Sequence, residues 1–240
     1  MTEKAFLIIA DISGFTGFMS QKSISLNHAK QIVVRLLKSI IDAAGSTLHV
    51  AEIEGDAVFL IAMVEGDGED VARLVRKKID DFFNAFQAER DSINDLRTCS
   101  CQACVQAGSL QLKQVIHLGE VVREKIGSFE KYFGPDVILV HRMLKNSVSA
   151  KEYAMMTLPA NVAAGPLEGL RKEERTEEFE GMGKVKTVVY VRPGSPITEH
   201  SQPSSVVQRL WWRFVISWRY MTDFLGIHPF RGVFRNLPTE

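Results

Sequence analysis

The most constraining feature of the sequence is a dense apolar run near its start that ends in a single acidic residue. Residues 6–10 are Phe-Leu-Ile-Ile-Ala, and Asp11 follows them directly. An apolar run without alternation is typical of a strand that is buried on both faces. Because an isolated carboxylate is costly to bury, Asp11 should be paired, hydrogen-bonded or bound to a metal ion. The sequence therefore predicts a core strand that carries a carboxylate at its end.

The residues after this strand favour a tight turn into a helix. Ser13 and Gly14 can turn the chain, and a helix that starts near Phe15 would direct free N–H groups at an anion. Two interpretations follow from this segment. It is a site for a metal ion and a phosphate group, or Asp11 simply caps the helix.

A second carboxylate is expected at a similar place. Residues 47–53 and 57–64 have the pattern of two strands joined by Glu54, Gly55 and Asp56, a short turn that can close a hairpin. If the strands that carry Asp11 and Asp56 are neighbours, the two carboxylates converge and repel each other. A divalent cation between them removes the repulsion, and oxygen ligands favour Mg²⁺ or Mn²⁺.

Helical periodicity separates these strands and predicts the fold class. Apolar residues recur at helical spacing over residues 29–44 and 71–86, and a further strand is expected over 110–122. A turn region at 127–134 should then lead into another helix, and Ile138 is a candidate for the inner face of that helix. The resulting order β-α-β-β-α-β is that of a ferredoxin-like split βαβ sheet, so we expect an α+β domain whose helices cover one face of the sheet.

The C-terminal part of the chain has a different composition. We expect one domain over residues 1–192, a linker rich in proline and serine over 193–204, and an amphipathic aromatic and basic segment over 205–240 that includes a helix. The apolar face of that helix needs a partner. The candidates are the surface of its own domain, a second subunit or a membrane surface.

The balance of charged residues and the sequence at the N-terminus indicate which partners and which cellular compartment to expect. Lys+Arg and Asp+Glu both number 29, so no overall field attracts the chain to nucleic acid, and we expect no nucleic-acid partner. The chain begins with a strand pattern instead of a signal peptide, and no run has the length of a transmembrane helix. The expected location is cytoplasmic, with peripheral membrane contact through the C-terminal segment as the open alternative.

Three cysteines form a cluster that suggests a second site. Cys99, Cys101 and Cys104 are spaced so that their thiolates could supply three of the four ligands of a tetrahedrally coordinated zinc ion. His117 and His141 are candidates for a fourth ligand, although neither is supported by spacing. The alternatives are a redox or reactive-thiol role and reduced cysteines on a loop.

Several of these segments together resemble a known family. Residues 10–16 (ADISGFT) are similar to the first metal motif of class III nucleotidyl cyclases, and residues 52–57 (EIEGDA) resemble the second. Residues 117–121 (HLGEV) and 132–143 are similar to a strand and to the catalytic helix of that family. The resemblance covers residues 5–192, and it is closer still to an uncharacterised family of cyclase-like bacterial proteins, DUF2652.

This resemblance implies roles for the metal and phosphate ligands. Asp11 and Asp56 would hold the metal ions, with the Ile12 carbonyl as a further ligand. The backbone amides of the turn after Ile12 would bind the phosphates, namely those of Gly14, Phe15 and Thr16.

The resemblance also implies how the base and the transition state are recognised. Glu52 takes a base-reading position in which a carboxylate goes with guanine, and Lys131 takes the partner position. Arg142 matches the arginine that stabilises the transition state. Ile138 replaces the asparagine expected to bind the ribose, and residues 180–183 (EGMG) replace a stretch that supplies a lysine to the triphosphate. Both replacements act against efficient turnover.

The function expected from the resemblance is metal-dependent binding of a nucleoside triphosphate, with formation of a 3′,5′-cyclic nucleotide. Family members share each active site between two protomers, so we also expect a head-to-tail homodimer. The alternative is a catalytically inactive pseudocyclase that acts as a regulatory or scaffold module.

Overall fold

The chain has an α+β fold built on one sheet, with β1 near its centre. The computed structural model describes residues 2–20, 25–96 and 100–194. The sheet has the strand order β2-β3-β1-β4-β6-β8-β7, and β5 pairs with β4 outside this path. The strands are β1 (Thr2–Ser13), β2 (His49–Glu54), β3 (Ala57–Met63), β4 (Gln111–Ile126), β5 (Phe129–Phe133), β6 (Tyr153–Thr157), β7 (Arg171–Phe179) and β8 (Gly183–Val191).

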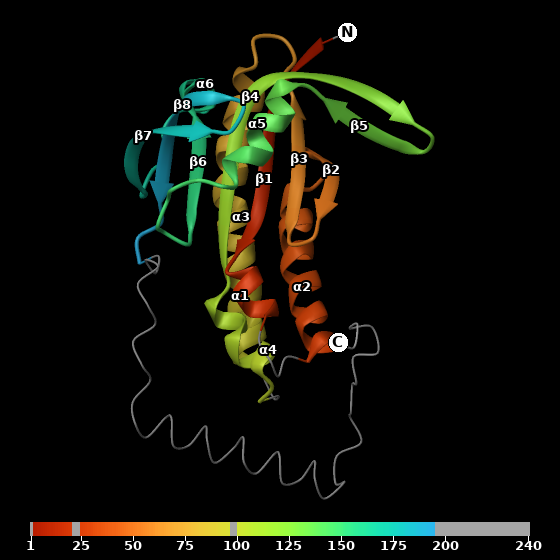
Figure 1. Cartoon of the computed structure of the whole chain (residues 1–240), viewed down its shortest axis with the longest axis vertical. Coiled ribbons are helices and arrows are strands. Elements are labelled where there is room, and N and C mark those ends of the chain that lie inside the picture. Colours follow the sequence, from red (N-terminus) through yellow and green to blue (C-terminus); the bar gives the residue numbers. More distant parts are fainter. Residues whose placement is uncertain (1, 21–24, 97–99, 195–240) are drawn as a thin grey trace, which may run out of the picture. The chain divides into compact units, whose positions relative to one another are not determined.

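Along the chain, helices separate most of these strands, and in space the strands lie beside one another in the sheet (Figure 1). The expected helices over 29–44 and 71–86 are present, and both are longer than their apolar patterns. The helices are α1 (Phe15–Met19), α2 (Leu26–Ala44), α3 (Glu69–Asp95), α4 (Gln102–Gln106), α5 (Pro135–Met143) and α6 (Leu158–Ala164), with a short 3₁₀ turn over Ala107–Ser109.

The register of the central strands brings the two acidic turns together. β1 is antiparallel to both β3 and β4, and Asp11 is paired with Ala57 on one side and with Lys113 on the other. Asp56 directly precedes Ala57, so the end of β1 and the β2–β3 turn meet. Among the described strands only β4 and β6 pair in parallel, so the sheet is mostly antiparallel.

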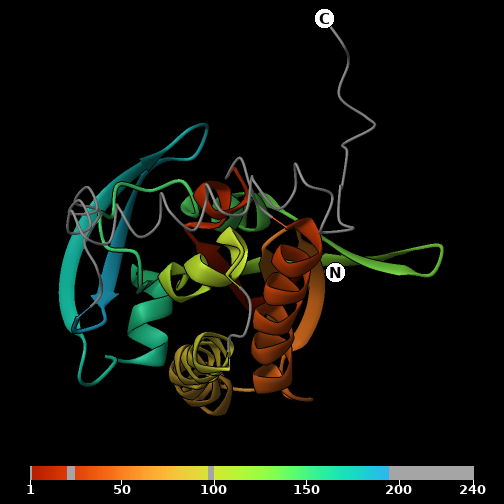
Figure 2. The same cartoon turned by 90° about the horizontal axis from the view of Figure 1, so that it is seen from below.

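Both faces of the sheet are covered by helices, so the expectation of helices on one face was wrong. Phe6, Ile8 and Ala10 of β1 point to the face that α2, α3 and α6 cover. The alternate residues Leu7 and Ile9 point to the other face, where α5 packs through three buried residues, Leu139, Val140 and Met143. Figure 2 shows α2 and α3 side by side on their face of the sheet.

Three local predictions also needed correction. The turn region at 127–134 contains the strand β5, which forms a ribbon with the outer part of β4. Ile138, a candidate for the inner face of its helix, is 53% exposed because the buried stripe of α5 runs through its neighbours. A loop was one alternative for the cysteines; Cys104 lies in the helix α4, whereas Cys101 lies in the connection directly before that helix.

The C-terminal predictions lie almost entirely outside the described residues. Of the expected linker over 193–204 only its first two residues are described, and the segment over 205–240 is not. Within the described part of the chain, no helix is long and apolar enough to cross a membrane.

Candidate metal and nucleotide site

Asp11, Asp56 and Lys113 form a compact charged group at the end of β1. The Nζ atom of Lys113 lies 2.7 Å from Oδ2 of Asp11, and the Asp11 side chain is 13% exposed. Asp11 and Asp56 line the same hollow, and the charge of Asp11 acts on the carboxyl group of Asp56. The N–H of Ile12 donates to the carbonyl oxygen of Asp56 at 3.2 Å, which ties the two turns together. The predicted convergence of the two carboxylates is therefore present.

The environment of Asp56 opposes a second negative charge. The pKa of Asp56 is raised to about 6, first by burial and then by the neighbouring charge of Asp11, while Lys113 acts against this shift. One lysine thus faces two carboxyl groups. Two carboxylates that repel each other in a partly buried place fit the requirements of a divalent cation with oxygen ligands.

The charged group opens into a hollow of about 340 Å³. Residues 11–17 line one side of it, and the segment from Asn146 to Tyr153 lines the other and includes Lys151. Gly14 has a φ of 89°, in the left-handed region that glycine tolerates, and it turns the chain directly into α1. The N–H groups of Phe15 and Thr16 belong to the first turn of α1, where helix geometry provides no intrahelical acceptor.

Sequence reasoning missed the two lysines of this hollow. Lys113 interrupts an otherwise apolar strand, but only the pairing of β4 with β1 places it beside Asp11. Lys151 belongs to the connection between α5 and β6, whose position depends on tertiary packing. A lysine within a buried strand pattern was the available signal for Lys113, because a buried ammonium group also needs a partner.

The two expected base-reading residues are neighbours. Lys131 Nζ lies 2.6 Å from Glu52 Oε2, and the two side chains are 41% and 42% exposed. The contact joins β5 to β2, which are not paired as strands. The structure thus brings the two residues together, as an ion pair accessible to solvent.

Arg142 lies in a different hollow. This hollow, of about 710 Å³, is lined by α5 and by residues 178–180, and it includes Ile138. Nη1 of Arg142 donates to Oε2 of Glu180 at 3.1 Å. Within one chain the structure does not bring Arg142 to the hollow of Asp11 and Asp56. Instead, Arg142 contacts Glu180, the acidic residue of the EGMG segment.

A hydrogen-bond network anchors the start of α5 to β4. Oδ1 of Asp136 lies 3.0 Å from Nε2 of His117, and Oδ2 of Asp136 accepts from the N–H of Glu120 at 2.6 Å. The other ring nitrogen of His117 lies 2.9 Å from the Thr157 hydroxyl. A Cβ at Gly119 would lie 2.3 Å from Asp136 Oδ2, so the approach of the carboxylate requires glycine there.

The histidines proposed as ligands beside the cysteines are engaged elsewhere. His117 belongs to the α5 anchor, and Nε2 of His141 lies 2.9 Å from Oε1 of Glu54. The prediction that either is a fourth ligand was wrong. The histidine beside Cys101 and Cys104 is His28, and Cys99 lies outside the described residues.

Comparison with known proteins places the chain among its relatives. A profile of proteins of unknown function, DUF2652, matches residues 33–153. The chain is 34% identical over 208 residues to the uncharacterised protein Rv2561/Rv2562 of Mycobacterium tuberculosis. This alignment covers 85% of this chain and 94% of that protein. The chain belongs to the DUF2652 family. The predicted membership is confirmed.

Solved structures identify the fold of this DUF2652 protein. It is similar to the guanylyl cyclase Cya2 (TM-score 0.60, 15% identity, 85% of this chain and 96% of that one). It is also similar to the adenylyl cyclase CyaB of P. aeruginosa (TM-score 0.62, 13% identity, 80% and 95%). A third similar structure is the guanylate cyclase domain of RhGC from Catenaria anguillulae in complex with GTP (TM-score 0.56, 17% identity, 80% and 98%). The DUF2652 protein therefore has the fold of the class III cyclase domains.

Proposed function

We propose that this DUF2652 protein binds a nucleoside triphosphate together with Mg²⁺ or Mn²⁺ and converts it to a 3′,5′-cyclic nucleotide. The observation that carries the proposal is the convergence of Asp11 and Asp56 on one hollow beside a turn that enters a helix. This arrangement occurs in a chain with the cyclase fold, at the position where the sequence carries both acidic motifs.

The carboxylates of Asp11 and Asp56 and the carbonyl oxygen of Ile12 would hold the metal ion. When bound, the ion supplies positive charge that orients the triphosphate and offsets the charge developing during phosphoryl transfer. The amides of Gly14, Phe15 and Thr16 would receive phosphate oxygens. Lys113 holds Asp11 in place and supplies part of the positive charge that this end of the sheet needs.

Glu52, Lys131 and Arg142 would contact the base and the transition state. The carboxylate of Glu52 can accept from the N1–H and N2–H₂ groups of guanine, with Lys131 as its neighbour. Arg142 would stabilise the charge on the attacked phosphate. Since Arg142 lines a separate hollow, its contribution would come from the second protomer of a head-to-tail homodimer.

A second candidate function is that of a pseudocyclase that binds nucleotide without turnover and regulates or scaffolds a partner. Two observations favour it. The Arg142 side chain forms an ion pair with Glu180. The exposed Ile138 offers no hydrogen bond at the position where the cyclase pattern has asparagine. The loss of one positioned transition-state donor can reduce a rate by ~10²–10³.

The test is incubation of the full chain with Mn²⁺ and each of the four common ribonucleoside triphosphates, followed by mass spectrometry for cyclic monophosphates. We expect one cyclic product, lost in Asp56→Ala and retained in Asp42→Ala, which removes an exposed carboxylate from α2. Thermal stabilisation by Mn²⁺ plus nucleotide, measured on the same variants, separates the two candidates. Stabilisation that depends on Asp56 without product supports the pseudocyclase, and the absence of both results contradicts both proposals.

A further inference from the structure

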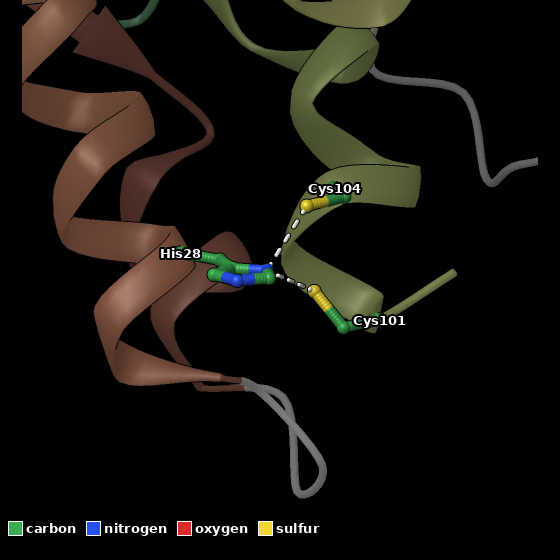
Figure 3. A group of neighbouring side chains, drawn as sticks. All are labelled: His28, Cys101 and Cys104. Carbon is green, nitrogen blue, oxygen red and sulfur yellow. Dashed lines mark hydrogen bonds between the residues drawn. The ribbon is translucent and has the colours of Figure 1, made fainter. Parts of the chain in front are cut away.

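A second group of potential metal ligands lies away from the hollow of Asp11 and Asp56. His28 in the first turn of α2 points between the sulfur atoms of Cys101 and Cys104 (Figure 3). Nδ1 of His28 lies 3.3 Å from Sγ of Cys101 and 3.4 Å from Sγ of Cys104. The three ligand atoms all lie within 4.8 Å of one another.

These separations match those of a metal-bound set. Bonds of ~2.3 Å from zinc to sulfur and ~2.0–2.1 Å to nitrogen, at tetrahedral angles, place a nitrogen and a sulfur ligand about 3.5 Å apart. The two observed nitrogen to sulfur distances lie close to this value. A pair of thiolates with one imidazole is also the type of ligand set that zinc selects over magnesium or calcium.

We propose that His28, Cys101 and Cys104 bind a zinc ion through Nδ1 and the two sulfur atoms. Each cysteine would bind as a thiolate, so two protons leave when the ion enters at a pH below the thiol pKa values. His28 would bind through an unprotonated Nδ1, with its proton on Nε2. The fourth corner of the tetrahedron would take a water molecule or another donor.

The position of this group explains what the ion would do. His28 and Cys101 are 73 residues apart in the sequence. Cys101 is buried in the same core cluster as α2 and α3, and α4 contacts both α2 and α1. α1 begins directly after the turn that carries Asp11 and Gly14. A zinc ion would therefore link α4 to α2 and support α1 beside the hollow of Asp11 and Asp56.

The experiment measures zinc in the purified full-length protein after dialysis, by elemental mass spectrometry. We expect one zinc per chain, and a fall in zinc affinity of at least ~100-fold in His28→Gln, because loss of a direct ligand should exceed the known effect of losing a supporting partner. The matched control is His49→Gln, which removes an exposed histidine of β2 and should retain the ion. Cys101→Ser and Cys104→Ser should also lose it.

Replacement of zinc by Co²⁺ gives a readout that does not depend on variants that fold. In the wild-type protein we expect thiolate-to-cobalt charge-transfer absorption, together with the visible bands of tetrahedral cobalt. Circular dichroism confirms that His28→Gln is folded before its zinc content is compared. The proposal is overturned if the wild-type protein retains no zinc and shows no thiolate band, or if folded His28→Gln binds zinc as tightly as the wild type.

Discussion

The surroundings of Asp56 disfavour the charged form of its side chain. Its pKa is raised from 3.8 to about 6, first by burial and then by Asp11. Between these two values the folded chain binds more protons at this residue than the unfolded chain does. The free energy of unfolding should therefore fall as the pH rises from about 4 to about 6 and stay level above that range.

The corresponding prediction concerns Asp56→Asn in the presence of a chelator. The variant should lack this part of the pH dependence and should be more stable than the wild type at pH 7 by about 1 kcal/mol, a value reduced for solvent screening because the group is only half buried. Urea unfolding at several pH values measures both effects. A wild type and a variant with parallel pH profiles would show that the folded-state pKa is not raised.

Among single elements, α5 depends on one close contact at its first turn. Asp136 reaches both His117 and the backbone of β4 across Gly119, which has no side chain to prevent it. The same helix carries Arg142 on its last turn. The orientation of Arg142 on α5 therefore depends on Gly119, which lies on the strand β4.

We predict that Gly119→Ala destabilises the protein by ~1–3 kcal/mol, because the new methyl group displaces the Asp136 carboxylate and leaves buried polar groups without partners. Gly17→Ala is the matched control. A Cβ at Gly17 meets nothing within 4 Å, and alanine is the better helix former, so this change should be neutral or stabilising. Thermal unfolding of both variants is the measurement, and equal melting temperatures would contradict the prediction.

The elements that sequence predicted well are those with strong local patterns. β1, α2 and the hairpin around Gly55 follow from dense apolar runs, helical spacing and turn residues. β5 was missed because its residues are polar or exposed, and only pairing with β4 makes them a strand. The face on which α5 packs depends on how the chain crosses the sheet, which periodicity does not encode. Lys113 was missed for a related reason, since its role follows from strand register.

For the molecule as a whole, the two hollows suggest a shared active site. Asp11 and Asp56 line one hollow and Arg142 lines the other. The ribbon of β4 and β5 also exposes apolar side chains that a second protomer could cover, with Phe129 70% and Phe133 49% exposed. The order of motifs along the chain sufficed to predict the fold, and the resemblance to the cyclases implied that the metal ligands and the arginine come from different protomers.

We predict a homodimer, measured by sedimentation velocity over a dilution series. In a head-to-tail dimer, Asp56→Ala and Arg142→Ala subunits should complement each other, because each mixed dimer contains one intact site. Cyclic nucleotide formation by the mixture, compared with each variant alone, is the readout. A chain that sediments only as a monomer, or a mixed dimer that shows no recovery where the wild type is active, would contradict the prediction.

The strand β4 has a consequence for how this family can vary in length. Along its 16 residues it pairs with β1, β6 and β5, so three registers depend on a single segment. One inserted or deleted residue within it would turn every following side chain to the opposite face of the sheet. Lys113 or His117 would then leave its partner. Insertions in evolution should therefore collect at the ribbon tip around Gly127, where a longer turn can leave the pairs from Ile126 and Phe129 onward in place.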